Sequence, residues 1–276
     1  MTKNRKVSII IATYNHSNSL LKAIESAYNQ SYEDLEVIVI NDGSTDGTKD
    51  LLENLKNILT NKNRIIVINQ ENKGVIDARN TAINIATGDY IFPLDSDDFF
   101  YDDFVIEDMM KEITSADVVC VYGAYRSFGK KDKVNIPKDF NKLELLMGNF
   151  VSNSSLFRKD VFLKAGGYKN YMKDGYEDWE LFIRMSNFGE FKKMDRIIFF
   201  YKMQDNSRNE KAIILDKNLR EIIIENNIDI YSKNFLQIMQ NKDKKILKIS
   251  KKVKRYRKIT LLLATILIIN LFATIS

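Results

Sequence analysis

The sequence predicts an α/β fold built on a doubly wound, mostly parallel sheet. Short runs rich in Val and Ile recur through the first 125 residues, and helical patterns separate them. The apolar runs show little polar alternation, which is typical of strands buried on both faces of a sheet. Strand–helix–strand units of this length connect in the right-handed sense, so a parallel sheet with flanking helices is expected.

Five apolar runs are the expected strands of this sheet. They are "KVSIIIA" (6–12), "LEVIVI" (35–40), "RIIVIN" (64–69), "DYIFPL" (89–94) and "DVVCVYG" (117–123). Apolar residues at helical spacing predict helices between them, at 18–30, 47–59 and 75–87. Because ligands of such sheets bind beyond the carboxyl ends of the strands, the polar stretches at 13–15, 41–44 and 94–98 are expected to meet at one crevice.

The second half of the chain is less regular. We expect a loop or hairpin tip at 129–138, a short helix ended by two glycines within 157–168, a helix at 175–189, a strand at 196–203 and a helical stretch at 208–240. The expected segments are an α/β domain at 1–205, a helical extension at 206–241 and a basic stretch with a hydrophobic helix at 242–276.

The composition excludes several classes of site. The single cysteine, Cys120, lies in an apolar run and is expected to be a buried strand residue. His16 is the single histidine, and the sequence contains no cluster of His or Cys residues. This argues against a zinc site and against a Ser-His-Asp triad or a Cys-His dyad. No G-x-G-x-x-G follows the first strand and no P-loop motif occurs, so dinucleotide and P-loop interpretations lose support.

The positive charge is concentrated near the C-terminus. The net charge is +5, but residues 242–258 hold ten Lys or Arg and one Asp, so the rest of the chain carries −4. The chain is therefore not expected to bind nucleic acid. Residues 259–275 contain no charge and would extend about 25 Å as a helix, which is marginal for a bilayer core of about 30 Å.

A membrane surface is one expected partner of this C-terminal segment. Basic residues beside an apolar helix attract anionic lipid on the cytoplasmic side. With no N-terminal signal peptide, we expect a protein at the cytoplasmic face of the cell membrane, attached through its C-terminus. The alternative for 259–275 is a hydrophobic helix buried in an oligomer.

The stretch "FPLDSDDFF" (92–100) places Asp95, Asp97 and Asp98 within four positions after an apolar run. Carboxylates this close repel one another unless they are solvated or share a cation. One interpretation is a solvated turn that caps a following helix. The other is a site for Mg²⁺ or Mn²⁺, because hard cations prefer oxygen ligands. These residues alone leave both interpretations open.

Five motifs in order resemble those of the family 2 glycosyltransferases, which have the GT-A fold. They are "VSIIIATYN", "VIVINDGSTDGT", "NKGVIDARNTAI", "YIFPLDSDD" and "YEDWELFIRM", and they span roughly residues 5–205. The resemblance implies inverting transfer of a sugar from a nucleoside diphosphate donor, commonly UDP-linked, with Mg²⁺ or Mn²⁺. It also implies a glycan or lipid-linked acceptor, as in the synthesis of bacterial surface polysaccharides or glycoconjugates.

The resemblance also assigns roles to residues of the first half of the chain. Thr13, Tyr14 and Asn15 would lie at the nucleotide, and Asp42 would accept a hydrogen bond from a pyrimidine N–H. The nucleotide and the donor side would be supported by two residues of the "ARN" triplet, Arg79 and Asn80. Each also has an ordinary structural interpretation: Tyr14 could cap the sheet, Asp42 could form an Asx-turn, and Arg79 could make a surface ion pair.

The DXD motif of the family matches Asp95, Ser96 and Asp97. Asp95 would contact ribose or metal, and Asp97 would hold the metal on the pyrophosphate. Asp178 matches the base that activates the acceptor, with Glu177 and Trp179 as supporting or acceptor residues. The alternative is that Glu177 and Asp178 only cap a helix.

The sequence departs from the family pattern in one place. Many relatives carry a histidine near the pyrophosphate after the base helix, whereas this chain has "FYKMQDNSRN". Lys202 or Arg208 could take that role. Two other functions are the alternatives, a sugar nucleotidyltransferase and a non-catalytic sugar-nucleotide binding protein. The first lacks its glycine-rich phosphate loop, and the second would not need Asp178.

Overall fold

The structure is a computed structural model that describes residues 5–58, 64–204 and 207–273, with backbone alone at 56–58 and 257–273. The chain forms two compact units, residues 1–227 and 228–276. The predicted hydrophobic segment at 259–275 therefore lies outside the residues whose side chains are described.

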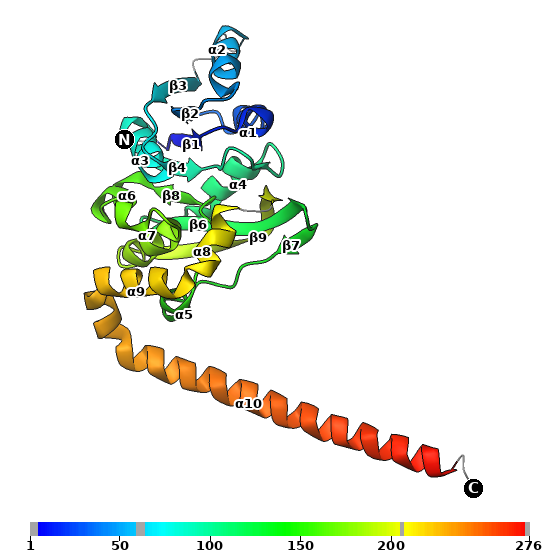
Figure 1. Cartoon of the computed structure of the whole chain (residues 1–276). Coiled ribbons are helices and arrows are strands. Elements are labelled where there is room, and N and C mark those ends of the chain that lie inside the picture. Colours follow the sequence, from blue (N-terminus) through cyan, green and yellow to red (C-terminus); the bar gives the residue numbers. More distant parts are fainter. Residues whose placement is uncertain (1–4, 59–63, 205–206, 274–276) are drawn as a thin grey trace. The chain divides into compact units, whose positions relative to one another are not determined.

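The first half of the first unit alternates strands and helices as predicted (Figure 1). Its elements are β1 (Val7–Thr13), α1 (Ser17–Tyr28), β2 (Leu35–Asp42), α2 (Thr48–Ile58), β3 (Ile65–Gln70), α3 (Val75–Ile85) and β4 (Tyr90–Pro93). These strands pair in parallel, and Val7 of β1 lies opposite Leu35 of β2 on one side and Tyr90 of β4 on the other. The carboxyl ends of β1, β2 and β4 therefore meet at one edge of the sheet.

The second half adds strands of both directions to the same sheet. Its elements are β5 (Phe99–Phe100), α4 (Val105–Glu112), β6 (Val118–Gly129), β7 (Lys133–Asn135), α5 (Lys142–Met147), β8 (Leu156–Arg158), α6 (Lys159–Lys164), the 3₁₀ turn η1 (Asn170–Met172), α7 (Glu177–Met185) and β9 (Glu190–Met203). The strand order is β3-β2-β1-β4-β8-β6-β9-β5, with β7 paired to β6. The short β8 pairs antiparallel with β4 and β6, whereas β6 and β9 run parallel.

Both faces of the central sheet are covered. On one face Ile9 and Ile11 of β1 pack in a core with Leu20 of α1 and Met109 of α4. The alternate residue Ile10 points to the other face and is also buried. Figure 1 shows α3 and α6 on one side of the sheet and α1 and α4 on the other. The unbroken apolar runs therefore reflect burial on both faces, as predicted. The edge strand β3 is the exception, because all of its residues are half-buried or exposed.

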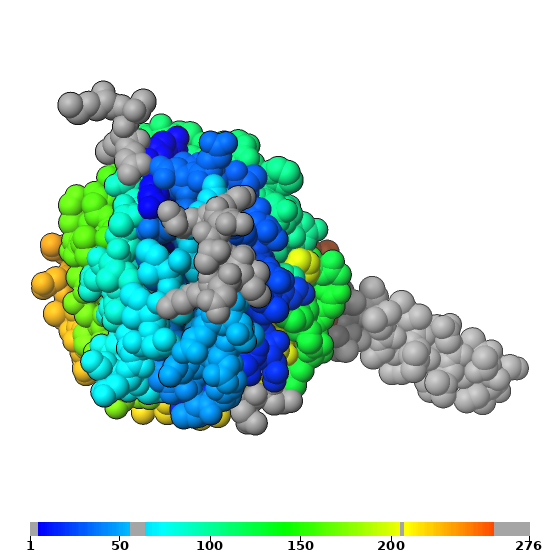
Figure 2. Space-filling view, turned by 90° about the horizontal axis from the view of Figure 1, so that it is seen from above, coloured from blue at the N-terminus to red at the C-terminus, as the bar shows by residue number. Residues whose placement is uncertain are grey.

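In the part of the chain that the structure describes, three helices follow β9. Two of them, α8 (Arg208–Ile214) and α9 (Asp216–Asn226), belong to the first unit, although the sequence analysis assigns them to a helical extension. The long helix α10 (Ile228–Ala273) makes up the second unit. Seen from above, the blue and cyan residues of the first third of the chain gather on one face of the first unit (Figure 2).

Candidate active site

A cleft of about 950 Å³ opens beyond the carboxyl ends of β1, β2 and β4. Its lining comes from both halves of the first unit. The first half contributes 12–14, Asp42, Arg79 and the acidic turn 95–98, and the second half contributes 148–154, 175–179, 201–202, 204, 207–209 and 211–212. The polar strand ends that the sequence analysis expects at one crevice are therefore brought together.

The end of β1 supplies the first wall of the cleft. Tyr14 is 46% exposed, so its ring is available to a ligand. Thr13 is buried, and its Oγ1 has no hydrogen-bond partner among the described residues. A buried hydroxyl without a partner is costly, and a ligand in the cleft could satisfy it.

Asp42 is buried at the end of β2 and organises the neighbouring loop. Its Oδ1 accepts hydrogen bonds from Gln70 Nε2 at 2.7 Å and from the Lys73 backbone N–H at 2.9 Å. Its Oδ2 accepts from the Gly74 backbone N–H at 2.8 Å. A carboxylate can accept about four hydrogen bonds, so Asp42 keeps capacity for one more donor from a ligand.

Two residues predicted at the nucleotide do not line the cleft in the described part of the chain. Asn15 binds the loop after β2, where its Oδ1 accepts from the Thr45 backbone N–H at 2.7 Å. Asn80 brackets Tyr168: its Nδ2 donates to the Tyr168 carbonyl at 3.0 Å, and its Oδ1 accepts from the Tyr168 N–H at 3.1 Å. Both side chains hold loops rather than face the cleft.

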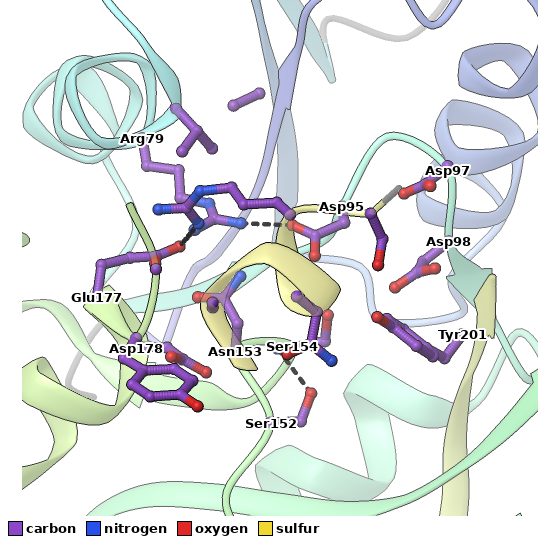
Figure 3. A pocket seen from close by; sticks show the side chains of 18 of the residues that line it. Arg79, Asp95, Asp97, Asp98, Ser152, Asn153, Ser154, Glu177, Asp178 and Tyr201 are labelled. Atoms are coloured by element: carbon purple, nitrogen blue, oxygen red, sulfur yellow. Dashed lines mark hydrogen bonds and ion pairs between the residues drawn. The ribbon is translucent and has the colours of Figure 1, made fainter. Parts of the chain in front are cut away.

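The acidic turn after β4 orients its three carboxylates differently (Figure 3). Asp95 accepts from Arg79 Nη2 at 2.5 Å, and Asp97 accepts from Gln204 Nε2 at 3.2 Å. Asp98 is buried and accepts from the Lys202 backbone N–H at 2.8 Å. Its Oδ2 has no hydrogen-bond partner within the described residues.

Burial and mutual repulsion act on two of these carboxylates. Burial, followed by the charge of Asp95, raises the pKa of Asp97. Burial and the charges of Asp95 and Asp97 raise the pKa of Asp98 well above its usual value. The Lys202 side chain also lines the cleft, and its positive charge partly lowers the pKa values of Asp97 and Asp98. The turn is thus a concentration of negative charge that the nearby protein cations only partly offset.

This donor set fits a divalent cation that a substrate also ligates. Across the described ranges, no group of three or more His, Cys, Asp or Glu side chains is arranged to hold a metal ion alone. Mg²⁺, however, is usually bound by one or two carboxylates together with substrate phosphates. The concentration of charge that raises the pKa values of Asp97 and Asp98 is consistent with such an arrangement, in which Asp97 and Asp95 would be the protein ligands.

Ser96, within the acidic turn, is buried against the start of α1. Its Oγ lies 2.6 Å from His16 Nδ1, and its carbonyl accepts from Ser19 Oγ at 3.1 Å. His16 also lines the cleft. These bonds fix the acidic turn against α1, so Ser96 acts here as an anchor.

A buried ion network joins the two halves of the site. Arg79 donates to Asp95 and, through Nη1, to Glu177 Oε1 at 2.7 Å. The same Glu177 oxygen accepts from Arg208 Nη1 at 2.6 Å. Burial alone would raise the pKa of Glu177, but the charges of Arg208 and Arg79 outweigh it and lower that pKa. Glu177 therefore stays ionised and links α7 to the acidic turn.

Asp178 lies beside this network with a different electrostatic environment. Burial, followed by the charge of Glu177, raises its pKa to about 7. It accepts from the Trp179 backbone N–H at 2.7 Å and from Asn149 Nδ2 at 3.1 Å. A carboxylate with a pKa near the working pH is well suited to take and release a proton.

The position of Asp178 depends on how α7 begins. Tyr176, at the N-cap, has φ +61°, a left-handed conformation that is uncommon for a side-chain-bearing residue. Its hydroxyl donates to Asp216 of α9 at 2.8 Å, which holds the turn in place. Trp179 is buried, and its Nε1 donates to the Leu145 carbonyl at 2.7 Å. The carboxylate is thus mounted on a rigid helix start.

Comparison with known proteins identifies the family. The family model described as "Glycosyl transferase family 2" matches residues 8–180. A UDP-Glc:α-D-GlcNAc-diphosphoundecaprenol β-1,3-glucosyltransferase of Escherichia coli, WfaP, is 33% identical over 180 residues, which are 63% of this chain and 68% of that protein. The chain belongs to glycosyl transferase family 2.

Two further relatives are longer than this chain. A hyaluronan synthase of Pasteurella multocida is 28% identical over 81% of this chain, and a chondroitin synthase of Escherichia coli is 30% identical over 76% of it. The matches cover 23% and 31% of those two proteins. This chain therefore spans less than a third of the length of these synthases.

Solved structures confirm the GT-A fold that the family implies. Staphylococcus aureus TarS 1–349, in complex with UDP-GlcNAc, matches with a TM-score of 0.63 at 19% identity, over 75% of this chain and 61% of that one. A mannosyltransferase of Pyrobaculum calidifontis, in complex with GDP-Man and Mn²⁺, matches with a TM-score of 0.62 at 19% identity, over 77% and 61%.

The family motifs did not indicate every residue that lines the cleft. Residues 149–154 between α5 and β8 form part of the wall, but "NFVSNS" carries no motif that the sequence analysis uses. Its only signal is a run of small polar side chains before a short strand. Arg208, named only as a stand-in for the missing histidine, binds Glu177 in this structure.

Proposed function

We propose that this family 2 glycosyltransferase moves a sugar from a UDP-sugar to a glycan or lipid-linked acceptor with inversion. One observation carries the proposal: a single cleft joins the acidic turn at Asp95–Asp98 to Asp178, whose pKa is raised to about 7. The first group suits a diphosphate leaving group with its cation, and the second suits an acceptor hydroxyl. A binding protein without catalytic activity would not need the second.

The chain's own groups would divide the reaction between them. Asp178 takes the proton of the acceptor hydroxyl as that oxygen attacks the anomeric carbon. The bond from the anomeric carbon to the phosphate oxygen breaks, and the diphosphate leaves with the electron pair. Asp97 and Asp95 would hold Mg²⁺ or Mn²⁺, which neutralises charge on the diphosphate when bound. Thr13, Tyr14 and Asp42 would hold the nucleotide.

A donor panel tests this function. The purified chain is incubated with UDP-, GDP- and dTDP-sugars, with Mg²⁺ or Mn²⁺ or with a chelator, and released nucleoside diphosphate is measured. We expect release from a UDP-sugar that depends on the divalent ion and is lost in Asp97→Asn. Full activity after chelation would refute the metal assignment, and release from no donor would refute the function.

The C-terminal unit supports a second proposal, that α10 binds an anionic membrane at the cytoplasmic face. No helix in the described residues is long and apolar enough to cross a bilayer. Six exposed apolar residues follow one another at spacings of three, four or seven residues: Phe235, Met239, Ile246, Ile249, Val253 and Tyr256. At these spacings they form one stripe along the helix.

The opposite side of α10 is basic. Lys244, Lys248, Lys251 and Arg255 recur at spacings of three and four residues, about half a turn away from the apolar stripe. An apolar stripe with a Lys- and Arg-rich polar face is typical of helices that lie in a membrane interface. A second copy of α10 is a poorer partner, because so many like charges would repel along the paired helices.

Vesicle flotation tests the membrane proposal. We expect the full chain to float with vesicles of phosphatidylglycerol and phosphatidylcholine, and to float less with phosphatidylcholine alone. Changing Lys244, Lys248, Lys251 and Arg255 to Glu should abolish flotation, whereas Lys131→Glu with Lys133→Glu serves as the control. Equal flotation of the four-residue variant, or a dimer that forms through α10 instead, would contradict the proposal.

A further inference from the structure

The cleft contains a polar group that the proposed reaction leaves unused. Asn153 lines the cleft, and its amide nitrogen Nδ2 is shielded from solvent. Within the described part of the chain this nitrogen has no hydrogen-bond partner. Buried amide groups are nearly always paired, because an unpaired donor loses its water without replacement. A donor left unpaired in a substrate cleft is expected to be satisfied by the substrate.

A hydrogen bond from Tyr168 fixes the orientation of the Asn153 amide. Tyr168 Oη donates to Asn153 Oδ1 at 2.9 Å. Burial raises the pKa of Tyr168, so this phenol stays protonated and can donate. With the carbonyl oxygen occupied by that donor, the amide's remaining group is an N–H₂. Asn153 therefore presents hydrogen-bond donors, and an acceptor oxygen is what would satisfy them.

Tyr168 is itself held by a motif residue. The Asn80 amide binds both the N–H and the carbonyl of Tyr168. Gly167, which precedes it, has φ +67°, and a Cβ there would lie 3.2 Å from Asn80 Oδ1 and 3.3 Å from the Phe162 ring. Glycine thus permits the close approach of this turn to Asn80. The chain of contacts runs from α3 through Tyr168 to the cleft.

The location indicates which part of the substrate Asn153 would meet. In the view of Figure 3, Asn153 lies between Asp178 and the acidic turn. In a single displacement the transferred sugar must lie between the leaving diphosphate and the base, so that the acceptor can attack opposite the leaving group. Groups placed between those two ends of the cleft face the sugar rather than the nucleotide.

We propose that Asn153 donates a hydrogen bond to an oxygen of the transferred sugar, and that Asn80 and Tyr168 are positioning residues for it. The inference rests on the proposed function and adds to it a specificity-determining residue. The oxygen is a ring hydroxyl or the carbonyl of an acylamino group, since both accept hydrogen bonds.

The test measures donor binding and uses UDP as the reference. With Mg²⁺ present, Asn153→Ala should bind UDP as the wild type does and bind the UDP-sugar about fivefold to tenfold more weakly. Among deoxy analogues of that donor, one should bind the wild type more weakly and lose no further affinity in Asn153→Ala. Tyr168→Phe keeps the ring and should show a smaller loss of the same kind. Asn135→Asp, outside the cleft, is the control.

The outcomes separate this inference from the proposed function. Unchanged UDP-sugar affinity in Asn153→Ala would overturn the inference while the function stands. An equal loss for UDP and UDP-sugar would make Asn153 a structural residue, which also overturns it. A wild-type chain that binds neither UDP nor any UDP-sugar would refute the function itself. If Asn153→Ala does not fold, the UDP-sugar affinity of Tyr168→Phe, measured with the deoxy analogues, still tests the inference. Unchanged affinity in Tyr168→Phe would then overturn it.

Discussion

Between residues 7 and 98 most polar groups of the cleft lie where parallel strands end, with Arg79 of α3 as an exception, whereas Asp178 and Asn153 of the second half lie at a helix start and in a loop. Asp42 follows β2 directly, and the acidic turn follows β4. Asp178 begins α7, and Asn153 lies before β8. The strand-end groups are placed by backbone pairing. The others depend on side-chain contacts between distant segments.

The two regions also differ in which groups compensate the charge of a buried carboxylate. Asp42 is satisfied by local backbone N–H groups from its own half. Glu177 is satisfied by Arg79 and Arg208, which come from distant parts of the chain. Asp178, one residue further, forms no ion pair within the described residues, and burial, followed by the charge of Glu177, raises its pKa to about 7. Burial and the charge of Glu177, which the ion network keeps ionised, therefore set the electrostatics around Asp178.

The largest effect should come from removing the base. Asp178→Asn should lower kcat by about 10²- to 10⁴-fold, because the acceptor hydroxyl loses the group that takes its proton. The affinity for UDP with Mg²⁺ should stay near wild type, since the nucleotide residues belong to the other half. Steady-state kinetics and calorimetry measure the two quantities.

The control for this prediction is Asp174→Asn, an exposed carboxylate in the preceding loop. It should leave both quantities unchanged. A normal transfer rate in Asp178→Asn would show that Asp178 is not the base. A loss of UDP binding would show that Asp178 also supports the nucleotide side of the cleft.

A second prediction breaks the network between the halves. Glu177→Gln leaves Arg79 with Asp95 as its remaining ion-pair partner and leaves Arg208, which is partly exposed, without this carboxylate. Breaking a fully buried pair costs about 3–5 kcal/mol of unfolding free energy, and we expect a smaller loss here because both arginines keep a partner or solvent. The Glu177 charge also raises the pKa of Asp178. The acid limb of the kcat/KM profile should therefore move to lower pH in the variant.

Urea unfolding and a pH–rate profile measure these two effects, with Glu190→Gln at an exposed position as the control. An acid limb that stays in place would show that Glu177 does not tune the base. Unchanged stability would show that the network is not needed to hold the halves together.

The smallest effect concerns stability and pH. Because the pKa of Asp178 is raised to about 7, the folded state binds this proton more tightly than the unfolded state does. Asp178 therefore lowers the unfolding free energy as the pH rises from its ordinary pKa of about 4 toward 7. Asp178→Asn should melt a few degrees higher than wild type at pH 8, and the gain should shrink toward pH 4.

Thermal melts of both proteins across this range check the sign. A gain that grows as the pH falls would contradict the raised pKa. A constant gain at every pH would point to packing rather than to ionisation.

The sequence by itself determined the succession of strands and helices along the first half and the residues at its strand ends. Unbroken Val and Ile runs such as 35–40 predict strands buried on both faces, and β2 confirms this. Parallel pairing then brings Thr13, Asp42 and Asp95 to one edge without further information. The pattern of apolar residues is a local property of the sequence, so it can be recognised without the structure.

Only the tertiary structure decided which of the motif residues face the cleft and which support it. Asn80 shares a motif with Arg79, yet it holds Tyr168 and through it Asn153, 73 positions further along the chain. Glu177 and Asp178 are adjacent and chemically alike, yet one has a lowered pKa and the other a raised one. The physical reason is the same in both cases. Hydrogen-bond partners and burial come from segments far apart in sequence, and spacing along the chain does not encode them.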